Sequence, residues 1–177
     1  GFFMKKAYLY LENGSCFEGK SPKWQEHHCE GEVVFTTGMV GYTESLTDPS
    51  FEGQLLTFTY PLQGNYGVET SQSWESTRIH PKGVIFGQMS SFWDHSQSMK
   101  SLLEWLKESN IPIIHDLDTR ALTKEIRNQG VMKGKIVYSS RPSTTFSSLP
   151  KNPWEQVSLK KPTLFRDGFF KRIIAID

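Results

Sequence analysis

The feature that most constrains the fold is a pair of short strand-like runs joined by Asn13-Gly14. Both central residues of a type I′ turn need a positive φ, which asparagine and glycine adopt more easily than other residues. The run Ala7–Leu11 precedes this turn, and Cys16–Gly19 follows it. We therefore expect a β-hairpin over residues 6–19.

Further strands are predicted where β-branched and aromatic residues gather between turn-forming residues. Such residues fit the pleated, half-buried surface of a sheet. The expected strands cover residues 32–37, 54–60, 83–87, 111–114 and 135–138.

Two helices are predicted among the later strands. Apolar residues recur at helical spacing over residues 99–106, with Ser96 or Ser98 as the N-cap. A second helix is expected over residues 119–128, capped by Asp118. Strands mixed with helices in this order indicate a mixed α/β fold.

The net charge of +1 hides a strong polarity along the chain. Residues 1–119 hold 8 Lys+Arg and 15 Asp+Glu, whereas residues 120–177 hold 12 and 4. The basic half could contact nucleic acid or an acidic protein, and a stand-alone binding module of this kind is one hypothesis. The alternatives are two halves that neutralise each other and a solvated basic linker.

Composition excludes several classes of protein. No apolar run approaches the roughly 18 residues that a membrane-spanning helix needs. Two cysteines cannot build the disulfide framework of a small secreted domain, so a cytoplasmic location is expected. Residues 1–3, which precede Met4, are interpreted as a cloning scar.

The end of the chain predicts a domain boundary. Nine of the twelve residues from Ser139 to Pro150 are Ser, Thr or Pro, which is typical of a linker. We assign residues 4–138 to one domain and residues 139–170 to the linker. The final run, residues 171–177, has a buried-strand pattern and is predicted to be the first strand of a truncated second domain.

No catalytic, cofactor or metal site is predicted from the residue patterns. The cluster His27–Glu30 places four candidate ligands side by side, whereas zinc sites use spaced pairs that converge. Neither Cys16 nor Cys29 has the sharp turn or neighbouring base of an activated nucleophile. The glycine-framed loops at residues 38–41 and 64–67 lack a phosphate-binding pattern, and turn formation explains them better.

One stretch, residues 37–50, is unusually rich in special residues. Ser45, Thr47 and Ser50 place three hydroxyls around the turn Asp48-Pro49. A rigid turn presenting Ser50 could hold a polar ligand group. A self-satisfied Asx turn would explain the same residues.

Several motifs occur in order along the chain, and together they carry a family resemblance. They are Leu11–Gly14, Gly31–Glu44, Leu46–Phe51, Leu56–Pro61, Gly64–Gly67 and Asp118–Thr123. By these motifs, residues 5–138 resemble the N-terminal domain of the small subunit of glutamine-hydrolysing carbamoyl-phosphate synthetase.

The resemblance implies a compact β/β/α domain that docks the small subunit on the large synthetase subunit. It implies that residues 171–177 begin a class I glutamine amidotransferase domain, where a Cys–His–Glu triad outside this chain hydrolyses glutamine. The large subunit would combine the ammonia with bicarbonate, using ATP with magnesium. Ser50 matches the serine that lies against the glutamine pocket, so it is the substrate-binding residue expected here.

Overall fold

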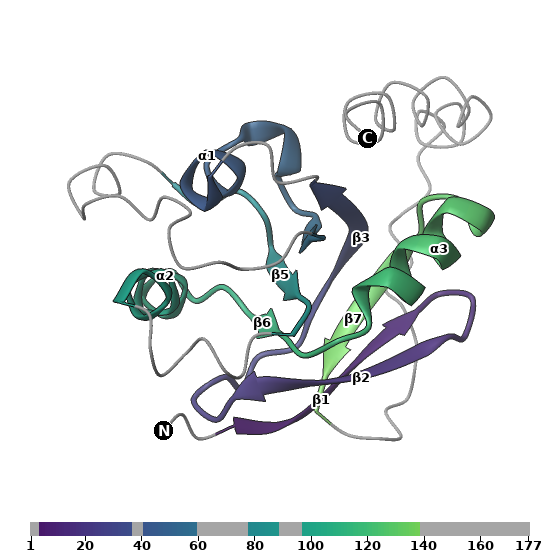
Figure 1. Ribbon diagram of the computed structural model, residues 1–177, viewed down its shortest axis with the longest axis horizontal. Coiled ribbons are helices and arrows are strands. Elements are labelled where there is room, and N and C mark those ends of the chain that lie inside the picture. The colour runs from purple at the N-terminus through teal and green to yellow at the C-terminus, as the bar shows by residue number, and fades with distance from the viewer. Residues whose placement is uncertain (1–3, 37–40, 60–77, 89–96, 139–177) are drawn as a thin grey trace.

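The computed structural model describes residues 4–36, 41–59, 78–88 and 97–138 (Figure 1). The mixed α/β class is confirmed, whereas the finer β/β/α description remains a prediction. The strands are β1 (Met4–Leu11), β2 (Cys16–Pro22), β3 (Cys29–Thr36), β4 (Leu55–Phe58), β5 (Gly83–Phe86), β6 (Ile113–Ile114) and β7 (Lys133–Val137). The helices are α1 (Tyr42–Leu46), the 3-10 helix η1 (Pro49–Phe51), α2 (Gln97–Glu108) and α3 (Thr119–Gln129).

The predicted hairpin is confirmed. Strands β1 and β2 pair antiparallel up to Tyr10 and Cys16, and the turn between them contains Gly14 with a φ of 95°. Ala7, Leu9 and Leu11 of β1 alternate into the core. The expected type I′ turn is wrong, because Asn13 does not have a positive φ. Instead the Gly14 N–H donates to the Leu11 carbonyl at 2.9 Å, and Gly14 supplies the positive φ of the turn. The hairpin therefore follows from this glycine and from a two-residue hydrophobic period.

The seven strands form one sheet in the order β2-β1-β7-β3-β4-β5-β6. Pairing is antiparallel from β2 to β3 and parallel from β3 to β6. Strands β4 and β5 are buried along their whole length, as expected for parallel strands covered on both faces. Each strand predicted within residues 4–138 is present, with bounds shifted by up to three residues where the structure describes them.

The two edges of this sheet meet, so the sheet nearly closes into a barrel. Lys20 in β2 exchanges two main-chain hydrogen bonds of 2.8 Å with His115, the residue after β6. Ser21 Oγ donates to the carbonyl of Ile113 at 2.6 Å. We call this contact between residues 20–25 and 113–115 the seam. It protects two strand edges that would otherwise have open hydrogen-bonding groups.

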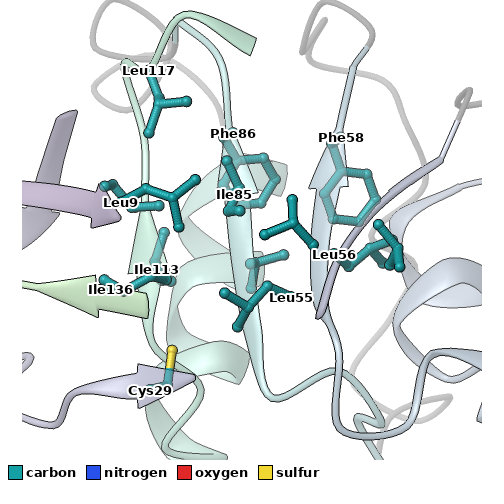
Figure 2. Close-up of a cluster of buried hydrophobic side chains, with 14 of the residues drawn as sticks. Leu9, Cys29, Leu55, Leu56, Phe58, Ile85, Phe86, Ile113, Leu117 and Ile136 are labelled. Atoms are coloured by element: carbon teal, nitrogen blue, oxygen red, sulfur yellow. The ribbon is translucent and has the colours of Figure 1, made fainter. Parts of the chain in front are cut away.

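One hydrophobic core runs through both parts of the sheet. Figure 2 shows Leu9 and Ile136, from the antiparallel part, in the same cluster as Leu55 and Ile85 from the parallel part. The Cys29 side chain reaches into this cluster from β3.

The helices agree with the predictions except at one cap. Helix α2 begins at Gln97, so Ser98 lies inside it and cannot be its N-cap; Ser96 lies outside the described residues. Asp118 caps α3 as expected, because its Oδ1 accepts from the Ala121 N–H at 3.0 Å. Helix α1 was not predicted, since five residues are too few to show a helical period.

Several expectations lie outside the described residues. They concern the cloning scar at residues 1–3, most of the loop at 38–41, the loop at 64–67, the linker at 139–170 and the strand at 171–177. Among the described helices, none is both long and apolar enough to cross a membrane.

Candidate functional site

The turn that carries Ser50 is a short, self-capped element. Pro49 begins η1, and the Asp48 side chain accepts a hydrogen bond from the Ser50 N–H at 2.9 Å. Phe51, the last residue of η1, is buried and anchors the turn to the core. The expected Asx turn is therefore present, and it uses the Ser50 main chain rather than the Ser50 hydroxyl.

Ser50 is the exposed member of the three hydroxyl residues in this stretch. Ser45 lies inside α1 and is 2% exposed, and Thr47 Oγ1 donates to the Thr43 carbonyl at 2.7 Å. No described residue hydrogen-bonds Ser50 Oγ, and the side chain faces outward. Of the three, Ser50 is thus the one whose hydroxyl is available to a ligand.

A second segment, residues 78–80, holds both ends of the Ser50 turn. The His80 N–H donates to the carbonyl of Leu46 at 2.9 Å, ahead of the turn. The His80 carbonyl accepts from the Gly53 N–H at 3.2 Å, after the turn. Because His80 bonds the main chain on both sides of the turn, it holds Leu46 and Gly53 at a set separation.

Side chains reinforce these main-chain bonds at Glu52. The Arg78 guanidinium makes a bidentate contact with the Glu52 carboxylate: Nη1 donates to Oε1 at 3.2 Å and Nη2 donates to Oε2 at 3.0 Å. His80 Nδ1 lies 2.6 Å from Glu52 Oε2. Hydrogen bonds from Arg78, and secondarily from His80, hold the pKa of Glu52 below its usual value. We call Glu52, Arg78 and His80 the clamp.

The first residue of α1, Tyr42, packs in an aromatic cluster with Phe58 and Phe86. The Tyr42 ring meets Phe58 of β4 edge-on, with centroids 5.1 Å apart, and Phe58 stacks on Phe86 of β5 at 5.2 Å. Figure 2 shows the two phenylalanine rings side by side. Such pairs add to the stability gained from burial alone and fix where α1 begins.

The cysteines and the histidine cluster have separate environments. Cys16 is exposed on β2, whereas Cys29 is buried, and burial raises the pKa of its thiol to about 12. His27 and His28 are exposed while Cys29 points inward, so the cluster does not converge. Within the described residues, no group of three or more His, Cys, Asp or Glu side chains could hold a metal ion.

The clamp was missed by sequence reasoning, and so was a basic groove along α3. The clamp joins residues 26 and 28 positions apart, which no local pattern reveals. The groove did leave a signal: Arg120, Lys124 and Arg127 recur at helical spacing on a helix that was predicted.

Comparison with known proteins places the chain in a family. A family model described as carbamoyl-phosphate synthase small chain, CPSase domain, matches residues 9–136. The carbamoyl phosphate synthase small chain of Caldanaerobacter subterraneus subsp. tengcongensis is 44% identical over 157 residues, which cover 89% of this chain and 43% of that protein. The arginine-specific small chain of Bacillus subtilis is 40% identical over 172 residues, covering 97% and 47%.

A longer relative shows the same match in a different setting. The multifunctional protein ura1 of Schizosaccharomyces pombe is 40% identical over 210 residues, which cover 96% of this chain and 9% of that protein. The chain thus spans less than half the length of each of these relatives. From the family model and these identities, the chain belongs to the carbamoyl-phosphate synthase small chain family.

Proposed function

We propose that the protein takes part in glutamine-dependent carbamoyl phosphate synthesis by forming one wall of the glutamine pocket. The observation that carries the proposal is the exposed Ser50 hydroxyl on a turn held at both ends by His80. Family membership supports it, since residues 9–136 match the small-chain family model. The resemblance of residues 46–51 implies that Ser50 is the serine that would contact glutamine.

The chemistry of a hydroxyl fits this role. Ser50 Oγ can donate one hydrogen bond and accept two, so it can bond the α-carboxylate or the α-ammonium group of glutamine. A hydrogen bond to a charged group contributes more than one between neutral groups. A rigid turn also favours affinity for glutamine, because the turn loses little conformational freedom when glutamine binds.

Glutamine hydrolysis itself is assigned to residues outside this chain. The Cys29 thiol is buried with a raised pKa, and exposed Cys16 lies on a strand rather than a sharp turn. In the proposal a Cys–His–Glu triad in a following amidotransferase domain releases ammonia. A large synthetase chain, to which this domain docks, then joins the ammonia to bicarbonate using ATP with magnesium. These residues alone should therefore not hydrolyse glutamine.

The test is Ser50→Ala in the full-length small chain, assembled with the large synthetase chain. We expect the KM for glutamine to rise roughly tenfold or more, the effect of losing a bond to a charged group. Ammonia-dependent synthesis should be unchanged, since ammonia bypasses the glutamine pocket. Ser109→Ala, at an exposed serine after α2, is the matched control. Unchanged glutamine kinetics in Ser50→Ala would overturn the proposal.

A further inference from the structure

An open groove of about 510 Å³ runs along the outer face of α3. It extends from Thr59, just after β4, to the last turn of the helix. The described residues that line it are all polar or charged: Thr59, Thr119, Arg120, Thr123, Lys124, Arg127 and Asn128. Neither the function proposed above nor the Ser50 site uses these residues.

The groove is basic because of how α3 distributes its charges. Arg120, Lys124 and Arg127 fall at i, i+4 and i+7, which places them on one face of the helix. No Asp or Glu is among the lining residues that the structure describes. Glu125, the one carboxylate within α3, points away from this face and accepts hydrogen bonds from Asn13, at 2.7 Å, and from Ser15.

Helix stability does not account for this arrangement. The helix dipole favours cations in the last turn, which explains Arg127, but it disfavours them in the first turn. Arg120 is the second residue of α3. The acidic residue at this end is the N-cap Asp118, whose Oδ1 accepts from the Ala121 N–H, and no acidic residue follows it in the first turn. The helix dipole therefore does not explain the charge at Arg120.

We propose that this groove is the docking surface for an acidic surface of the synthetase chain, an inference that rests on the proposed function. The three cations are spread over about 10 Å of helix axis, which suits a row of carboxylates better than one phosphate group. All three are exposed, so pairing costs little desolvation and the surface steers association.

Two other occupants fit less well. Residues 139–177 of this chain hold 7 Lys+Arg against 3 Asp+Glu, so their net charge would repel them from the groove. Single-stranded nucleic acid would be expected to stack its bases on aromatic side chains, and the described residues that line the groove include none.

The experiment measures affinity between the full-length small chain and the synthetase chain. Arg120→Glu and Lys124→Glu should each weaken binding about tenfold at low salt and flatten its salt dependence. Lys124→Arg keeps the charge and should bind as the wild type does. Lys100→Glu, at an exposed lysine on α2 outside the groove, should leave the affinity within twofold. Thermal unfolding of each variant confirms that it is folded.

The outcomes separate this inference from the function on which it rests. If wild type binds and both charge reversals bind equally well, the groove is not the docking surface although the proposed function stands. If wild type fails to bind the synthetase chain, the docking function itself is wrong. If the reversals instead abolish salt-sensitive retention on RNA or DNA and leave synthetase binding intact, the groove is a nucleic-acid surface and the inference is overturned.

Discussion

The side-chain amide of Gln25 pairs with the main chain of Ile113 as a strand residue would. The Ile113 N–H donates to Gln25 Oε1 at 2.5 Å, and Gln25 Nε2 donates to the Ile113 carbonyl at 3.1 Å. Both residues are buried. Strand β2 ends at Pro22, which has no N–H to donate, so a side chain continues the pairing across the seam.

Replacing Gln25 with leucine should destabilise the protein by about 1–3 kcal/mol. The substitution fills similar volume but leaves the buried Ile113 N–H without its partner, and an unsatisfied buried donor costs that much. Denaturant unfolding of the wild type and Gln25→Leu measures the difference.

The control for this prediction is Gln129→Leu. Gln129 is exposed at the end of α3, where such a change alters stability by no more than about 0.5 kcal/mol. Equal stability of the wild type and Gln25→Leu would show that the seam does not depend on this amide.

In a double-mutant cycle, Cys29→Ala should relieve part of the destabilisation that Gly83→Ala causes. A Cβ added at Gly83 would lie 2.8 Å from Cys29 Sγ and 3.0 Å from Leu55 Cδ2, so Gly83→Ala should cost about 1–3 kcal/mol through overpacking. Cys29→Ala removes the closest of these atoms. The double variant should therefore be more stable than the sum of the two single effects, by at least about 0.5 kcal/mol.

Cys16→Ala provides the comparison for that cycle. Cys16 is exposed on β2 and does not contact Gly83, so its removal should relieve none of the strain. Additive effects in the Gly83–Cys29 pair, measured by denaturant unfolding, would refute the close packing of β5 against β3.

Local sequence signals predicted the strands and two helices, but not the contacts that shape the site. Asn13-Gly14 and the Asp118 cap act on residues within four positions, so the hairpin and the start of α3 could be predicted, although the type of turn could not. The Gln25–Ile113 pair spans 88 residues, and the Arg78–Glu52 pair spans 26. Such contacts depend on how the sheet curls, which no local pattern encodes.

The same limit applies to Ser50. The turn Asp48-Pro49 was predicted from residue types, and Ser50 was singled out by family resemblance. That Ser45 is buried and Thr47 bonded within α1 became visible only with packing. The periodic cations of α3 were present in the sequence, but a groove requires a neighbouring element, here the residue after β4.

Thiol labelling should distinguish the two cysteines. Only the thiolate reacts, and burial both shields Cys29 and raises its pKa to about 12. A thiol reagent should therefore modify Cys16 in the native protein and both cysteines in denaturant. Cys16→Ser should leave the native protein unreactive. Rapid modification of Cys29 in native Cys16→Ser would mean that the core around β3 opens readily.

The clamp should stabilise the Ser50 turn in a pH-dependent way. Because Arg78 and His80 lower the pKa of Glu52 in the folded state, the contribution is complete above the unfolded value, near 4.5. It is lost as the pH falls through the lower folded value. Wild type should thus unfold at a higher urea concentration than Glu52→Gln at neutral pH, and the two should converge in acid.

Glu18→Gln is the matched control, since Glu18 makes a longer contact with Lys6, 3.7 Å between two exposed groups. It should leave the urea midpoint unchanged at both pH values, because a single long contact between exposed groups contributes little, whereas Glu52 has two contacts with Arg78 and one with His80. In the assembled enzyme, Glu52→Gln should raise the KM for glutamine and spare ammonia-dependent synthesis, since a looser turn holds Ser50 less firmly. A urea midpoint that does not change with Glu52→Gln at neutral pH would show that His80 main-chain bonds alone hold the turn.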